Sequence, residues 1–493
     1  MKPQIEKVPV CERMFLGECR TVADVQLVAK ECENIQVLGL SADAVVLTAE
    51  SLSGEVLFDG KINVKAIIKD DDDNLAGLNF GTDFADKFLN NRITADTKTE
   101  VCASVDDVSF KKEGNVIYAK CVIVTKIFAF AFENHELVCD CEGLQVKKQN
   151  ALFCHQKAVA KKDITVVDEV ESRHDIVKIL MAQTNGIVSS VVCEDDVVSL
   201  KGDFFTCVTY VKDDNDVCSL MVKTPFEEEI SASGADVECI AFADIKQKST
   251  KVSIELSNDS ANEFTLEIQA QICATVFKNQ STSFVQDAFS MEYNIDLQTK
   301  SLQTCLPKEY IVHTCNADGV IDVQGVDEVL CITNPCVQIS GKTFAEDCLE
   351  IKGVVCADLF FVSEEKVLSS PVQIPFESKV QTGSNFACEV INKCVTQISA
   401  KVVRGAISIE SGLKFGINCY DMQKSVAVGN IMLLDKKADD GCAIEILTGK
   451  KGMTLWDVQK YLGMSEQDLL VCNPDLQLPL TQDKKILVYR KIQ

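Results

Sequence analysis

Residues 58–88 read "FDGKINVKAIIKDDDDNLAGLNFGTDFADKF", and two later stretches repeat their pattern. These are "LKGDFFTCVTYVKDDNDVCSLMVKTPFEEEI" (200–230) and "IKGVVCADLFFVSEEKVLSSPVQIPFESKV" (351–380). Each copy has a glycine, an alternating apolar run, an acidic turn, a second short run and a phenylalanine. The phenylalanine follows the glycine by 24, 24 and 23 residues. Such regular spacing favours an internal repeat over chance similarity among strands. The signature residues are Gly60, Gly202, Gly353, Phe84, Phe226 and Phe376.

Apolar side chains recur at every second position after each glycine. The three sets are Ile62, Val64, Ala66 and Ile68, then Phe204, Thr206, Val208 and Tyr210, then Val355, Ala357, Leu359 and Phe361. A period of two predicts a strand with one buried face. The acidic segments "KDDDDN", "KDDND" and "SEEK" that follow predict hairpin turns. Pro225 and Pro375 predict edge strands or strand starts, because proline cannot donate to a ladder.

A further β-like run closes each unit, at residues 115–130, 262–277 and 399–415. The sequence therefore predicts a mainly β fold. Three tandem related β-rich domains are followed by a small βααβ domain. The predicted domains are residues 1–145, 146–295, 296–435 and 436–493.

Length, charge and hydropathy limit the classes of function. The 493 residues are 46% hydrophobic and 25% charged, which is a globular composition. The net charge of −25 argues against nucleic acid or an anionic membrane surface as a partner. The acidic turns have two interpretations, solubility and a binding face for a basic partner. Residues 1–6 lack a signal-peptide pattern, and the apolar run at 122–132 is too short to span a bilayer. We therefore expect a cytoplasmic protein without membrane insertion.

Cysteine and histidine placement argues against metals and cofactors. The 24 cysteines are scattered singly, and the histidines (His135, His155, His174 and His313) are far apart. Structural zinc needs close ligand pairs, so we expect no metal and no cofactor. We expect most cysteines to be reduced and buried. The alternative is oxidative cross-linking within an assembled structure.

No catalytic motif is complete. Cys154 and His155 are adjacent, which in a strand points their side chains to opposite faces. Residues 336–343, "CVQISGKT", end like a phosphate-binding loop but have Cys336 in place of the first glycine. We therefore expect a non-enzymatic protein. An unrecognised hydrolase is an alternative without residues in its favour.

Residues 452–476, "GMTLWDVQKYLGMSEQDLLVCNPDL", predict two short helices. Thr454 and Asp457 form a Thr-x-x-Asp capping pattern, and Gly463 supplies a left-handed stop. Ser465 repeats the cap for a second helix, which Pro474 ends. Strand-like segments flank both sides, so the predicted order is β-α-α-β.

This segment, over residues 443–493, is similar to a LysM domain. Gly452, Thr454, Leu455, Trp456 and the pair Asn473-Pro474 carry the resemblance, with the "YLGMS" turn. In that family, the groove beside the first helix and the Asn-Pro loop binds N-acetylglucosamine polymers. Met453 replaces the family's usual aspartate, and Gln482-Asp483 replaces its late Pro-Gly. The resemblance therefore implies the fold more strongly than the sugar binding.

Three repeats followed by such a domain resemble SipL-type spore-coat morphogenesis proteins, which combine SPOCS repeats with a C-terminal LysM domain. The three glycines and the pairs Pro225-Phe226 and Pro375-Phe376 carry this resemblance. In those proteins the LysM domain docks the ATPase scaffold that coats the forespore. The resemblance implies a coat-assembly scaffold in the mother cell, at the forespore surface, whose repeats contact other coat proteins.

Two functions remain open for the LysM-like groove, formed by Gly452, Met453, Thr454, Leu455, Trp456, Asn473 and Pro474. The first is docking of the spore-coat basal-layer ATPase, and the second is binding of peptidoglycan in cell wall or cortex. For Trp456 the alternative is a core residue of the small domain. If the groove docks a partner, a charge at Asp457 or Gln459 should weaken docking without unfolding the domain.

Overall fold

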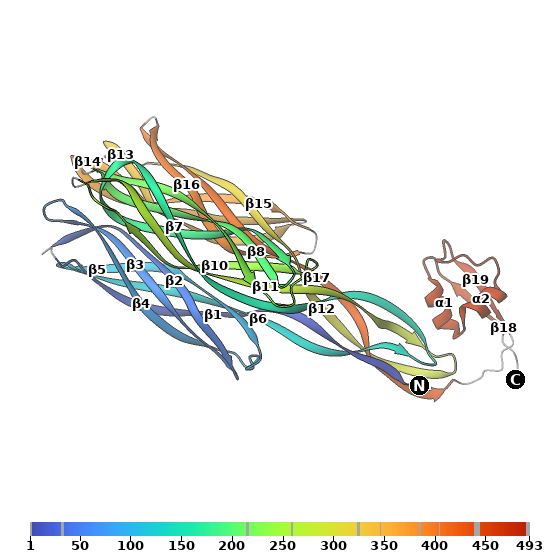
Figure 1. Cartoon of the computed structure of the whole chain (residues 1–493). Coiled ribbons are helices and arrows are strands. Elements are labelled where there is room, and N and C mark those ends of the chain that lie inside the picture. The colour runs from blue at the N-terminus through green and yellow to red at the C-terminus, as the bar shows by residue number, and fades with distance from the viewer. Residues whose placement is uncertain are drawn as a thin grey trace.

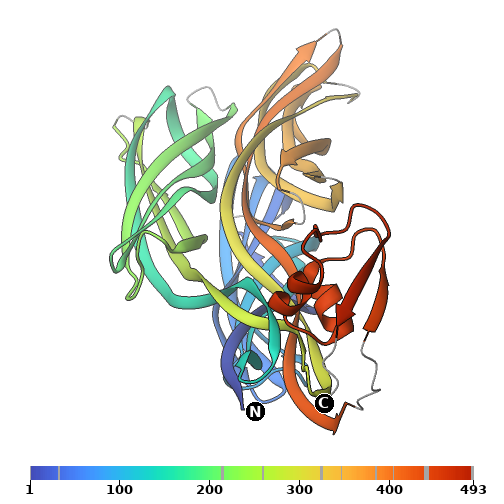
Figure 2. The same ribbon diagram turned by 90° about the vertical axis from the view of Figure 1, so that its right-hand side faces the viewer.

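The computed structural model of the chain describes residues 2–30, 34–212, 216–257, 260–322, 326–345, 347–383, 386–403, 405–437 and 444–489. Within these ranges the chain is mainly β, and its two helices lie in the C-terminal unit. The strands form three groups, which Figure 2 shows in blue, green and yellow to orange. A small C-terminal unit lies beside one end of the molecule (Figure 1).

Each group of strands contains one copy of the sequence repeat, and we call the groups repeats 1, 2 and 3. The strands of repeat 1 are β1 (Pro3–Val28), β2 (Ile35–Leu52), β3 (Glu55–Asp70), β4 (Leu75–Leu89), β5 (Lys98–Glu113) and β6 (Val116–Cys141). Those of repeat 2 are β7 (Gln145–Glu194), β8 (Val197–Lys212), β9 (Val217–Ser231), β10 (Ile240–Ser253) and β11 (Ala261–Phe289). Those of repeat 3 are β12 (Tyr293–Ile321), β13 (Glu328–Ala345), β14 (Cys348–Ser363), β15 (Lys366–Gln381), β16 (Phe386–Val403) and β17 (Ala406–Lys436).

The repeats share one antiparallel topology. In repeat 1 the sheets have strand orders β1-β6-β5 and β2-β3-β4, and in repeat 3 the orders are β12-β17-β16 and β13-β14-β15. In repeat 2 the 50-residue strand β7 belongs to both halves, which joins them in the order β10-β11-β7-β8-β9. A separate hydrophobic cluster fills each repeat.

The predicted alternation is confirmed. In β3, β8 and β14, all twelve predicted inward positions are buried, and none is more than 6% exposed. The other face of these strands is also buried in places, as at Ile67, Cys207 and Phe360. The sequence predicts burial of one face only, because it does not show that the repeats pack against each other.

The predicted turns and edges are confirmed where the structure describes them. The first acidic turn joins β3 to β4, and Asp73 has a φ of 63°. The third joins β14 to β15, with φ of 50° at Glu364 and 61° at Glu365. The tip of the second turn, residues 213–215, lies outside the described residues. β9 and β15, which carry Pro225 and Pro375, are edge strands.

The third closing run is β, as predicted, but it is divided between two strands. The first two runs lie in single strands, β6 and β11. Residues 399–415 instead span the end of β16, a turn and the start of β17. Gly405, with a φ of 84°, reverses the chain there, since glycine adopts this conformation without steric cost.

Each repeat has one strand pair whose end projects away from the rest of the repeat, and the three projecting ends pack together as a stalk. We define the stalk as residues 3–10 paired with 133–141, 145–155 with 278–289, and 293–305 with 422–436. Its buried side chains come from all three repeats: Val8, Val10, Leu137, Phe153, Phe284, Leu302 and Ala427. The chain passes from one repeat to the next at the stalk tip, where the N-terminal strand also begins (Figure 1).

A second shared cluster joins the repeats away from the stalk. Leu38 and Ile67 come from repeat 1, and Leu180, Met181, Val211 and Val217 from repeat 2, while Cys331 and Phe360 come from repeat 3. Burial of one such apolar side chain contributes about 1.5–3 kcal/mol. The three repeats therefore form one packed body.

The C-terminal unit, residues 444–489, has the predicted β-α-α-β order. Its elements are β18 (Ile444–Gly449), α1 (Leu455–Leu462), α2 (Glu466–Cys472) and β19 (Lys484–Tyr489). The two strands pair in an antiparallel sheet, and the helices cover it over a small core. We call this segment the βααβ unit.

Candidate functional site

The sequence determines both helices of the βααβ unit through their caps. The Thr454 hydroxyl accepts a hydrogen bond from the Asp457 backbone N–H, and the Asp457 carboxylate accepts one from the Thr454 backbone N–H. This is the predicted capping box. Gly463 ends α1 with a φ of 62°, as predicted. Ser465 caps α2 through the Asp468 backbone N–H, also as predicted.

Trp456 points away from the core of its own unit. The core consists of Leu447, Val458, Leu462, Leu469, Leu476, Leu480, Ile486 and Val488. Met453 and Leu455, two other predicted site residues, are half-buried against it. Trp456 and Lys460 are one helical turn apart, so they share the opposite face of α1. We call this surface the α1 face.

The end of β11 contacts the α1 face. Trp456 Nε1 donates a hydrogen bond to Asp287 Oδ2 at 2.8 Å. Lys460 Nζ lies 2.6 Å from Asp287 Oδ1 and 2.8 Å from Oδ2. The Trp456 ring packs edge-on against Phe289, with centroids 5.2 Å apart. The α1 face therefore binds the stalk tip of its own chain, to which α1 is turned in Figure 1.

A second pair of charges flanks this contact. The hydrogen bond from the Thr454 backbone N–H lowers the pKa of Asp457 most, and the positive charge of Lys147 lowers it further. Lys147 lies opposite Asp287 in the register of β7 and β11. The helix therefore carries Asp457 and Lys460, and the stalk carries Lys147 and Asp287. Each acid lies near a lysine of the other side.

The other predicted site residues have structural roles or lie open. Asn473 Nδ2 donates to the backbone oxygens of Leu469 and Leu487, and Asn473 Oδ1 accepts from the Leu487 N–H. The Asn473 amide therefore ties the loop that contains Pro474 to β19 and is not directed outwards. Gly452 has a φ of 88°, and a Cβ there would meet no atom within 4 Å.

One prediction about this face was wrong. Gln459 was expected to be a surface position where a charge would be tolerated, but it is only 8% exposed. Asp457 is already the charged partner in the capping box. Lys460 is therefore the better position for a charge substitution.

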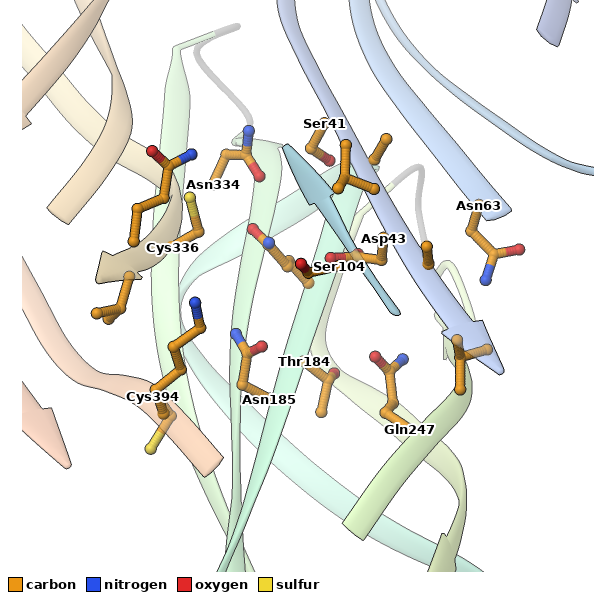
Figure 3. Close-up of a pocket in the computed structure, with 18 of the residues that line it drawn as sticks. Ser41, Asp43, Asn63, Ser104, Thr184, Asn185, Gln247, Asn334, Cys336 and Cys394 are labelled. Carbon is orange, nitrogen blue, oxygen red and sulfur yellow. The ribbon is translucent and has the colours of Figure 1, made fainter. Parts of the chain in front are cut away.

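A polar cavity of about 600 Å³ lies between the three repeats. Figure 3 shows Ser41 and Asp43 of repeat 1 facing Thr184 and Asn185 of repeat 2, with Asn334 of repeat 3 beside them. Three lysines also line it, one from each repeat: Lys65, Lys246 and Lys393. Burial lowers the pKa of Lys65 and of Lys393, and raises the pKa of Asp43. These shifts favour the uncharged forms.

Three amide oxygens in this cavity accept no hydrogen bond from the part of the chain that the structure describes. Asn334 Nδ2 donates to Asp358 Oδ2 at 3.1 Å, and Asn392 Nδ2 donates to Asp244 Oδ1 at 2.9 Å. These bonds orient both amides and leave each Oδ1 without a hydrogen bond from the described residues. Gln183 Oε1 likewise has no hydrogen bond from the described residues. Buried acceptors are usually satisfied by water, and the cavity is large enough for several molecules. The arrangement therefore suits ordered water between the repeats.

The two incomplete catalytic motifs of the sequence do not adopt the geometry that their chemistry needs. Residues 341–343 lie within strand β13, so they do not form the loop that holds a phosphate. Cys154 is buried and His155 is half-exposed on β7, consistent with opposite faces. Among the described residues, no group of three or more His, Cys, Asp or Glu side chains is placed to hold a metal ion. Neither helix in the described ranges has the length and apolar character needed to cross a bilayer.

The comparisons with known proteins give no relative. No protein-family model matches the chain, and no curated protein or solved structure matches it.

Proposed function

We propose that this chain is a non-enzymatic scaffold in spore-coat assembly, and that its βααβ unit docks the basal-layer ATPase of the coat. The three repeats provide contacts with other coat proteins, in the mother cell at the forespore surface. The observation that carries the proposal is the α1 face, where Trp456 and Lys460 project outside the core of their own unit. An aromatic side chain beside a cation, outside the core of its own unit, is typical of a protein-docking residue pair.

The packed body of three repeats supports the scaffold role. Two shared clusters, one in the stalk and one away from it, hold the repeats in one arrangement. The last strand of repeat 3, β17, ends in the stalk, so the βααβ unit is attached near the stalk tip. The body thus supports one terminal docking unit and leaves the outer surfaces of three related domains for other partners.

The alternative, binding of peptidoglycan through the LysM-like groove, is weaker on geometry. The Asn473 amide, which lies in the family's sugar-binding loop, makes backbone hydrogen bonds within the unit. A ligand would therefore compete with bonds that hold β19 to the loop.

A retention assay distinguishes the two functions. The full chain is passed over immobilised coat ATPase from the same genome and, separately, over purified peptidoglycan. We expect retention on the ATPase and its loss in Lys460→Glu, while the matched variant Lys485→Glu, an exposed lysine on β19, is retained. Retention on peptidoglycan alone would make peptidoglycan binding the better supported of the two functions.

A further inference from the structure

The occupant of the α1 face shows which chemistry that face recognises. Asp287 and Phe289 are two residues apart on β11, so their side chains lie on the same side of the strand. Asp287 is 26% exposed at the side chain, and the ring of Phe289 is almost fully buried. A carboxylate and an aromatic ring on one strand face thus meet an indole and an ammonium on one helix face.

The donors of the α1 face favour an anion. The indole Nε1 of Trp456 and the ammonium group of Lys460 donate hydrogen bonds and accept none. Both converge on the single carboxylate of Asp287, and Lys460 contacts both of its oxygens. A neutral amide at this position would offer one acceptor and no charge. The Trp456 ring adds an edge-on aromatic contact, which selects for an aromatic residue two positions after the acid.

Attachment of the unit makes the internal contact favourable even if it is weak. Lys437, which follows β17, donates from Nζ to the backbone oxygen of Ser290, three residues after Asp287. The segment that leads to the βααβ unit therefore begins beside the end of β11, which carries Asp287. A short tether produces a high effective concentration, so an internal ligand occupies the site without strong intrinsic affinity.

We propose that the α1 face is a recognition site for an acidic–aromatic strand, Asp-x-Phe in sequence, which residues 287–289 of the same chain occupy until a protein partner displaces them. The partner presents the same chemistry, a carboxylate followed two residues later by an aromatic ring. This inference rests on the proposed function only for the identity of the partner, the coat ATPase.

The internal contact is tested without any partner. Trp456 is the only tryptophan of the chain, so its fluorescence reports this face alone. In Asp287→Asn we expect greater quenching by acrylamide than in the wild-type chain, and a shift of the emission to longer wavelength. The matched control is Asp296→Asn, an exposed carboxylate on β12, which should leave both unchanged. Unchanged quenching in Asp287→Asn would overturn the internal contact.

The recognition chemistry is tested with peptides on the Asp287→Asn chain. A peptide of residues 283–290, "SFVQDAFS", should restore protection of Trp456, whereas the same peptide with asparagine at 287, or with alanine at 289, should not. Equal protection by all three peptides would contradict an acidic–aromatic site.

The partner is tested last. We expect the Asp287→Asn chain to bind the coat ATPase more tightly than wild type, because the competing strand is weakened. Equal affinity of the two chains would show that the ATPase does not use this face. Absence of ATPase binding in both chains would contradict the proposed function, and the fluorescence and peptide results would still decide the recognition chemistry.

Discussion

Phe226 lies opposite Gly202 in strand register, and its ring fills the space that a side chain at Gly202 would need. A Cβ at Gly202 would lie 2.3 Å from a ring carbon of Phe226 and 2.4 Å from the backbone oxygen of Ile187. Gly60 has the same relationship to Phe84, and Gly353 to Phe376. The repeat signature therefore describes a packing unit in which an aromatic ring covers a glycine on the adjacent strand.

This packing predicts a stability effect. We expect Gly202→Ala to destabilise the chain by roughly 1–3 kcal/mol, because the backbone oxygen of Ile187 cannot move as a flexible side chain would. The matched control is Gly341→Ala in β13, where a Cβ would meet nothing within 4 Å. Thermal unfolding measures both, and similar melting temperatures for the two variants would contradict the account.

A buried ion pair joins repeats 2 and 3. Lys414 Nζ lies 3.1 Å from Asp203 Oδ2, and their side chains are 15% and 11% exposed. Lys223 also lies 3.2 Å from this carboxylate. We expect Lys414→Met to cost roughly 1–3 kcal/mol, because Asp203 would keep only one cation.

A double-mutant cycle checks this prediction. Adding Asp203→Asn to Lys414→Met should recover part of the lost stability, since it removes the charge left without its partner. Strict additivity of the two single effects in thermal unfolding would show that this ion pair does not couple the repeats.

Asp358 predicts a pH dependence of stability. Burial raises its pKa to about 6, although the hydrogen bond from Asn334 opposes the shift. Since the folded pKa lies above the unfolded value of about 3.9, this group's stabilising contribution is complete below pH 4 and is lost as pH rises towards 6. Asp358→Asn should therefore stabilise the chain by roughly 1–3 kcal/mol at pH 8 and by less at pH 5. An equal gain at both pH values, measured by chemical denaturation, would be inconsistent with a buried ionising carboxyl.

Cys388 and Cys419 face each other across β16 and β17, with their Sγ atoms 3.2 Å apart. The thiol hydrogen bond between them lowers the pKa of Cys388 and raises that of Cys419. We expect oxidised glutathione to convert this pair to an internal disulfide, with two thiol protons lost and two molecules of reduced glutathione formed. Peptide mass spectrometry detects the bond, and Cys388→Ser serves as the control. Recovery of both residues as free thiols, while other cysteines become oxidised, would oppose this prediction.

The sequence predicted the local parts of the fold well. Periodicity identified the buried positions of β3, β8 and β14, since a strand with an apolar core face repeats every two residues. Thr454 and Gly463 identified the limits of α1, because caps depend on residues close in sequence. Cys121, Cys207 and Cys419 are among the described cysteines that are buried, as expected.

Long-range contacts were not predictable from these patterns. Trp456 was identified as a site residue, but Asp287 lies 169 residues away in a strand with no distinguishing motif. The stalk was also missed, because Phe153 and Phe284 are buried in a cluster with side chains of the other repeats, such as Leu137 and Leu302. The burial of Gln459 and the polar cavity likewise depend on how distant segments pack.

The most direct test of the docking function is a titration of the full chain followed by the emission of Trp456. Coat ATPase from the same genome is added in one series and N-acetylglucosamine oligomers in the other. We expect a saturable change of emission with the ATPase and none with the oligomers, and Lys460→Glu should remove the ATPase response. A saturable change with the oligomers alone would contradict a protein-docking role for this face.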